Sequence, residues 1–246
     1  MNAENIYRTE ISPEVLELAK KINAKLKSNG SPPEIKGWKV WYSNIIERPD
    51  FLFIGINPNN VPEDIDYFGS SALEIDELKA QLEPDEDIRY NSETNWSLSV
   101  FTREAFQNAK IPISHNVKIN YYYLGTKDLT TLNNLSKDKY IGNDLKMELD
   151  FQSAKWTKKI IELINPKVII CEGSKAFNDL VIHALKQEKE RINIMNNEGN
   201  VRKALFKNIP VIGYSRAWER SSKNKRAKIL GEFVELLTET KTEYLK

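Results

Sequence analysis

Three short segments of this sequence carry residue types that could bind or transform a ligand. The first, Gly55-Ile56-Asn57-Pro58, follows an apolar run. Glycine lets a ligand approach the backbone closely, proline fixes the loop, and the Asn57 amide can donate to or accept from a water or a polar ring edge. A simple turn at the end of a strand explains the same residues, so both interpretations stand.

The second segment is the apolar stretch 117–124, which Asn120 interrupts. A buried amide that lacks a hydrogen-bond partner costs about 1–3 kcal/mol, so Asn120 must be satisfied by some other group. That group is either the edge of a ligand or the backbone beside the strand.

The third segment, residues 216–228, contains six Lys or Arg residues, one Glu and Trp218. Basic side chains with an aromatic residue at the start of a helix could contact phosphates and insert into a stack of bases. A solvated helix face is the alternative interpretation.

Other kinds of site have little support in the sequence. The two histidines, His115 and His183, show no metal-ligand spacing, and the single cysteine, Cys171, excludes an intramolecular disulfide. We therefore expect no metal and no cofactor. The aromatic pair Tyr67 and Phe68 could stack on a flat ligand or pack beneath their own loop.

Charge and length set wider limits. The 246 residues include 36 Lys or Arg and 35 Asp or Glu, which excludes a globally basic nucleic-acid-binding protein. Residues 62–89 carry ten acidic and two basic side chains and would repel a phosphate backbone unless they face away from it. No apolar run approaches the ~18 residues of a membrane span, so we expect a cytoplasmic monomer without membrane contact.

Apolar runs and helical spacing alternate along the chain. We expect helices at 12–26, 72–82, 96–109, 149–164, 174–184 and 222–239, and strands at 51–56, 117–124, 167–171 and 209–214, with an edge strand near 201–206. This alternation predicts a three-layer α/β/α fold around a mainly parallel, four-stranded central sheet. Ligands bind beyond the carboxyl ends of such strands, where the three segments begin.

Taken together, the segments resemble the uracil-DNA glycosylase superfamily. Gly55-Ile56-Asn57-Pro58 is similar to the first motif of its mismatch-specific uracil/thymine branch, although Asn59 stands where that motif has a second glycine. Residues 166–176 resemble a structural strand of the family, and Tyr214-Ser215-Arg216 occupies the place of its His-Pro-Ser motif without the histidine or the proline. The resemblance covers residues 38–236. It implies one domain, 1–246, in which residues 1–37 form an N-terminal helix and lead-in and residues 38–240 form a glycosylase-like core.

The resemblance also implies roles for individual residues. Asn57 would orient the attacking water, and Ser215 would be the second catalytic residue. Asn120 would read the base. The remaining contacts to the base would come from Gly55, Ile56, Pro58, Tyr67, Phe68 and Tyr214, and the contacts to DNA from Arg216, Trp218, Arg220 and Lys223.

Three hypotheses follow for the function. The chain is a divergent glycosylase that hydrolyses the N-glycosidic bond of uracil or another damaged base in DNA. Alternatively, it is an inactive module of the same fold that binds a nucleobase, a nucleic acid or a protein partner. Last, it is an unrelated α/β protein whose asparagines at the strand ends are structural.

Overall fold

Parallel pairing of four apolar strands organises the structure, a computed structural model that describes residues 2–30, 34–57, 79–80, 82–84, 96–185, 192–196, 199–220 and 222–245. These strands are β2 (Phe51–Gly55), β3 (Asn116–Asn120), β5 (Val168–Cys171) and β8 (Ile209–Tyr214). They lie in the order β3-β2-β5-β8, each parallel to its neighbour. The expected parallel core of the sheet is therefore confirmed.

Among the described residues the sheet has six strands, so the expected four-stranded sheet is not confirmed. The expected edge strand is β7 (Val201–Phe206), which pairs antiparallel with β8, and β6 (Ile192–Asn196) pairs antiparallel with β7 in turn. The β6 sequence lies in a polar, charged stretch and lacks the apolar run that marks a buried strand, which is why the sequence did not indicate it.

The stretch 117–124 does not form one strand. β3 ends at Asn120, and Leu124–Thr126 forms β4, which pairs antiparallel with β1 (Ile35–Trp38) in a separate small sheet. Between β3 and β4, the backbone N–H of Tyr121 donates to the Gly55 carbonyl at 2.8 Å. The Tyr122 N–H likewise donates to the Ile56 carbonyl at 2.9 Å, so the two chains stay side by side just beyond Asn120.

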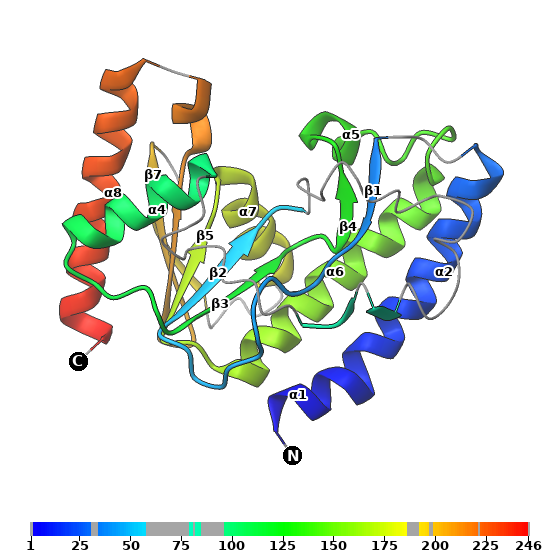
Figure 1. Cartoon of the computed structure of the whole chain (residues 1–246), viewed down its shortest axis with the longest axis horizontal. Coiled ribbons are helices and arrows are strands. Elements are labelled where there is room, and N and C mark those ends of the chain that lie inside the picture. The colour runs from blue at the N-terminus through cyan, green and yellow to red at the C-terminus, as the bar shows by residue number, and fades with distance from the viewer. Residues whose placement is uncertain are drawn as a thin grey trace.

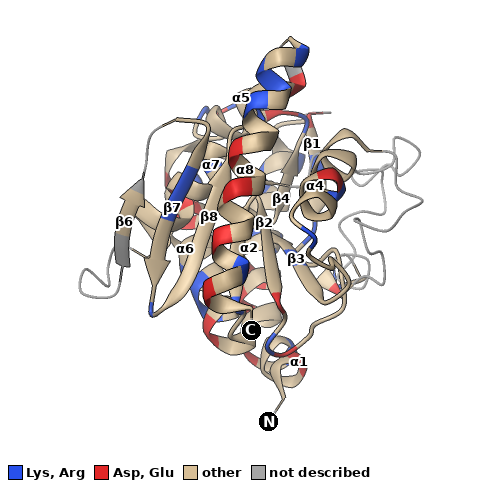
Figure 2. Ribbon diagram, turned by 90° about the vertical axis from the view of Figure 1, so that its left-hand side faces the viewer, with Lys and Arg blue, Asp and Glu red and all other residues tan. Residues whose placement is uncertain are grey.

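Helices cover both faces of the sheet. α4 (Ser97–Asn108) and α8 (Lys223–Tyr244) lie on one side, and α6 (Gly142–Ile164) and α7 (Ser174–Asn178), which continues as the π-helical turn η2 (Asp179–Ala184), lie on the other (Figure 1). Figure 2 shows α8 running across the sheet in front of the strands. Two short elements, α5 (Leu129–Asn133) and the 3₁₀ helix η3 (Arg216–Arg220), follow β4 and β8.

Alternating side chains of the strands enter two separate cores. Phe51 and Phe53 of β2 pack on the α4 and α8 side, whereas Leu52 and Ile54 pack on the α6 and α7 side. All four side chains are at most 1% exposed. Because both faces of the strands are buried, the three-layer architecture is confirmed.

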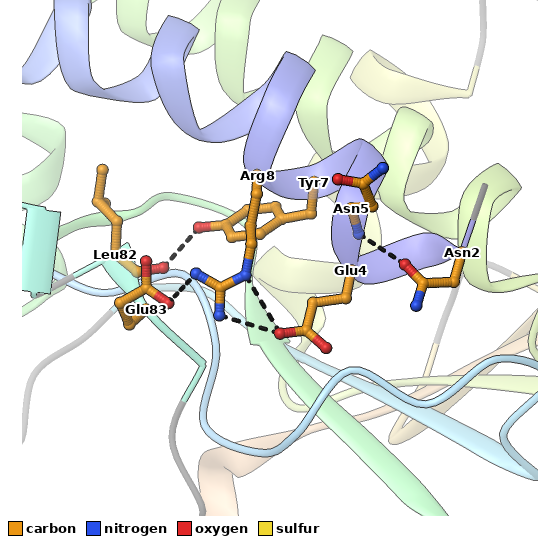
Figure 3. A network of polar contacts seen from close by, with 7 residues as sticks. All are labelled: Asn2, Glu4, Asn5, Tyr7, Arg8, Leu82 and Glu83. Atoms are coloured by element: carbon orange, nitrogen blue, oxygen red, sulfur yellow. Dashed lines mark hydrogen bonds and ion pairs between the residues drawn. The ribbon is translucent and has the colours of Figure 1, made fainter.

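The N-terminal helix begins earlier than residue 12. The segments α1 (Ala3–Ile6), η1 (Tyr7–Ile11) and α2 (Ser12–Ser28) run on from one another, and Asn2 caps the first of them by accepting from the Asn5 N–H. The Tyr7 hydroxyl donates to the Leu82 carbonyl at 2.6 Å, and Arg8 pairs with Glu4 and Glu83 (Figure 3). The short helix expected at 72–82 lies mostly outside the described residues.

Two glycine substitutions test this packing. A Cβ at Gly213 of β8 would lie 2.9 Å from two carbons of Phe177 in α7, whereas a Cβ at Gly231 of α8 meets no atom within 4 Å. Gly213→Ala should lower the free energy of unfolding in urea by about 1–3 kcal/mol through overpacking. Gly231→Ala, the matched control, should raise it by about 0.5–1 kcal/mol because alanine favours a helix interior. Equal effects of the two changes would contradict this packing.

Candidate functional site

A small polar cavity opens where β2, β3 and β5 end. Gly55 and Asn120 are the last partners in the β2–β3 register, and Glu172 follows β5, its N–H donating to the Ile54 carbonyl at 2.9 Å. The side chains of Asn57 and Asn120 both line this cavity. Two amides that are 63 positions apart in the sequence, as 120 − 57 gives, therefore meet at one edge of the sheet.

Asn57 is held by the β4 strand. Its Nδ2 donates to the Thr126 Oγ1 at 2.7 Å and lies 3.4 Å from the Thr126 carbonyl oxygen. The Thr126 hydroxyl donates in turn to the Asp128 carbonyl oxygen, so this chain of bonds reaches the start of α5. With Nδ2 engaged in this way, Oδ1 is the end of the amide that can accept a hydrogen bond from a water or a ligand.

Asn120 contributes a buried hydrogen-bond donor. The residue is 4% exposed, and its Nδ2 has no hydrogen-bond partner in the described part of the chain. Its Oδ1 lies so close to Gly55 that a Cβ at residue 55 would overlap it. The glycine is thus required for the position of the amide, and the donor without a partner marks a place where a ligand would restore a hydrogen bond.

A buried ion pair lies beside the two amides. Lys118 Nζ bonds Glu172 Oε2, and the two side chains are only 5% and 1% exposed. Lys118 is two residues before Asn120 on the same face of β3, and its Nζ lies 5.7 Å from the centre of the Trp96 ring. Both charged residues line the cavity.

Sequence reasoning missed this ion pair, although a signal was present. Lys118 stands inside an apolar stretch and Glu172 directly follows one, and buried charges in proteins are normally paired. A lysine inside one apolar stretch and a glutamate directly after another could therefore have been predicted to pair.

The cavity has the size of a water site. Its volume is about 20 Å³, and a cavity needs roughly 10–15 Å³ to hold one water molecule. Sites that enclose a drug-sized ligand measure about 300–1,000 Å³, so this space by itself does not enclose a base. Its lining suits one ordered water, which requires two to four polar partners.

Two further residues expected at the site are placed there, and others lie outside the described residues. Gly55 and Ile56 line the cavity. Pro58, Tyr67 and Phe68 are not among the described residues, and neither is the side chain of Arg220.

Tyr214 and Ser215, which directly precede the third segment, do not line the cavity. Tyr214 is fully buried, with its ring packed against Phe233 and its hydroxyl 3.3 Å from the Thr102 Oγ1. The Ser215 Oγ accepts from the Ala217 N–H at 3.2 Å at the start of η3 and does not line the cavity. The structure thus does not bring the expected catalytic Ser215 or the expected base contact Tyr214 to Asn57, because β8 directs Tyr214 into the core under α8.

Trp218 and Arg216 also differ from the expected DNA contacts. Trp218 is 6% exposed and stacks on Phe101 with ring centres 4.5 Å apart, so its ring packs within the core and is not presented as a wedge. Arg216 lines the cavity and bonds Glu219, and its side chain passes beside Gly173, where a Cβ would lie 3.4 Å from the Arg216 Cδ. Burial lowers the pKa of Arg216, but the nearby Glu219 carboxylate outweighs this and the net pKa is raised.

The start of α8 is positively charged. Lys223 and Lys225 are exposed, and the first turn of the helix contains no acidic residue (Figure 2). Each cation at a helix N-terminus destabilises the helix by about 0.3–1 kcal/mol, so these lysines do not contribute to the stability of α8.

Within the described ranges, no group of three His, Cys, Asp or Glu side chains is placed to hold a metal ion. Among those same residues, no helix combines the length and the apolar character that crossing a membrane requires. No protein-family model matches the chain, and no curated protein is similar to it.

Gly55→Ala tests the close approach of Asn120 to the backbone. The added methyl group would displace the Asn120 amide, which we expect to lower the free energy of unfolding by about 1–3 kcal/mol. The side-chain amide resonances of Asn120 in an ¹⁵N-labelled sample should shift by more than those of Asn143, which lies exposed on α6. Unchanged resonances at Asn120 would contradict the geometry described for the pocket.

Proposed function

We propose that this chain binds a nucleobase turned out of DNA at the Asn57–Asn120 cavity and hydrolyses the N-glycosidic bond of that base, as a divergent relative of the uracil-DNA glycosylases. The single observation that carries the proposal is the buried Nδ2 donor of Asn120, which lacks a partner on a cavity that Asn57 shares. The carbonyl oxygen of a base could accept the hydrogen bond that this donor lacks.

Recognition requires the base to leave the duplex. A base edge is inaccessible inside the stack, so enzymes that act at the glycosidic bond extrude the nucleotide. Because the cavity has room for a water only, the ring would rest at its mouth with its polar edge toward Asn120. Uracil or a related damaged base presents a carbonyl oxygen there.

Hydrolysis needs a positioned water and a stabilised sugar cation. Thr126 fixes the Asn57 amide, which leaves Oδ1 to accept from a water in the cavity. A preorganised dipole of this kind favours the transition state because it needs no rearrangement as charge develops. No metal or organic cofactor enters this scheme.

Contacts to DNA would come from the basic residues near the same edge of the sheet. Arg216 lies on the cavity, and Lys223 and Lys225 are exposed at the start of α8. These side chains could neutralise phosphates on either side of an extruded nucleotide.

One observation favours the alternative function, an inactive module that binds a nucleobase, a nucleic acid or a protein partner. Neither Ser215 nor Tyr214 lines the cavity, so the end of β8 and the residue after it supply no catalytic side chain to it. Under this alternative, the donor of Asn120 would bind a ligand without any cleavage.

Base release distinguishes these functions. Wild-type protein should release the base from single- or double-stranded oligonucleotides that carry uracil or another deaminated base. Asn57→Ala and Asn120→Ala should each lower the single-turnover rate by about 10²–10³, the usual effect of removing one preorganised polar group. Asn143→Ala, an exposed amide on α6, serves as the control and should leave the rate unchanged.

The same oligonucleotides separate catalysis from binding. Absence of release by the wild type from every damaged base, together with binding that Asn57→Ala leaves unchanged, would reject the enzyme and support the binding module. In fluorescence anisotropy, Lys223→Glu should weaken DNA binding and should reduce its dependence on salt concentration.

A further inference from the structure

We infer that Glu172 is the general base of the hydrolysis proposed above, and that Lys118 is its counter-charge. The inference rests on the proposed function and adds a catalytic residue to it. It depends on one juxtaposition: the buried carboxylate of Glu172, the residue directly after β5, lies on the water-sized cavity that Asn57 and Asn120 line.

Glu172 is the carboxylate that the described lining of this cavity contains. A Cβ built on Gly55 would lie 3.4 Å from its Oε2, and it would overlap the Asn120 Oδ1 as well. The carboxylate and the amide therefore approach the same point of the β2 backbone. The residue is 2% exposed, so bulk water does not compete for it.

Stability alone does not account for the Lys118–Glu172 pair. Removing two charges from water is unfavourable, and well-packed apolar residues of similar volume commonly replace such a pair without loss of stability. The other residues in the interior of these two strands are apolar: Val117 and Ile119 in β3, and Ile169 and Ile170 in β5. An ion pair in such surroundings is explained if its charges act on something in the cavity.

The cavity can hold the water molecule from which a general base would take a proton. Its volume of about 20 Å³ fits one water molecule, and a water there would have Asn57 and Glu172 among its polar neighbours. Asn57 Oδ1 can accept a hydrogen bond from one O–H of this water. The Glu172 carboxylate can accept a hydrogen bond from the other O–H and then take up its proton.

The chemical step then balances without any further reagent. The water oxygen forms a bond to the anomeric carbon while one water proton passes to the Glu172 carboxylate. The bond between the anomeric carbon and the base nitrogen breaks, and its electron pair leaves with the base. The base anion afterwards takes up a proton, and Glu172 returns its own proton to solvent.

Lys118 contributes to the same step through its charge. Before the reaction, the ammonium group is neutralised by Glu172. Once Glu172 holds the water proton, its carboxyl group no longer neutralises this ammonium group, at the moment when negative charge develops on the departing base. In a buried site, such a field favours the transition state.

Chemical rescue tests the inference. Glu172→Ala should lower the single-turnover rate of base release by at least 10²-fold, the lower limit of typical general-base contributions. Added sodium formate, a small carboxylate, should restore the rate of this variant at least tenfold and with saturation. Formate should not restore the rate of Asn57→Ala, since that variant retains its carboxylate.

A second variant keeps the test decisive if Glu172→Ala fails to fold because Lys118 has lost the Glu172 carboxylate. Lys118→Met/Glu172→Gln removes both charges together, and it should unfold cooperatively on heating like the wild type while its base release falls at least 10²-fold. Glu148→Ala, which removes a surface partner of Lys21, is the control and should keep the wild-type rate.

The outcomes separate the two proposals. Wild-type release together with full activity of the double variant, or the absence of formate rescue in a folded Glu172→Ala protein, overturns the role of Glu172 alone. The absence of base release by the wild type overturns the proposed function and this inference together.

Discussion

The parallel register of β2 between β3 and β5 is the constraint on which the site depends. It pairs Gly55 with Asn120 and Ile54 with Cys171, so the residues that follow all emerge at one edge. Asn57, Asn120 and Glu172 then meet, although they come from three separate parts of the chain. A shift of one residue in the β2–β3 pairing would turn Lys118 and Asn120 toward the opposite core and away from Glu172.

The strands accommodate two buried charges and two buried amides because each has a specific neighbour. The absence of a side chain at Gly55 admits the Asn120 amide, Thr126 engages the Asn57 amide, and Lys118 neutralises Glu172. Tyr42 covers the open side of β3, where its N–H donates to the Lys118 carbonyl at 2.9 Å. The Nδ2 of Asn120 is the exception, and an unsatisfied donor within an otherwise matched polar group indicates where a ligand belongs.

How much the sequence predicts depends on the kind of interaction involved. Apolar runs such as 51–56 and 167–171 specify buried parallel strands, and the rule that ligands bind beyond their carboxyl ends correctly brings Asn57 and Asn120 together. Local pattern fails where pairing decides, as it does in the polar strand β6 and in the division of 117–124 into two strands. It fails again at Trp218, because a basic stretch does not reveal that this ring stacks on Phe101. Lys118 and Glu172 show the same limit, since their partnership exists only in three dimensions.

The most direct test is a crystal structure with an oligonucleotide that contains 2′-fluorinated deoxyuridine, whose glycosidic bond resists cleavage. The expected result is a uracil turned out of the helix, a carbonyl oxygen of that base about 3 Å from the Asn120 Nδ2, and a water between Asn57 and Glu172. A duplex bound with its uracil still stacked, or a base held elsewhere while the Asn120 donor stays without a partner, would contradict it.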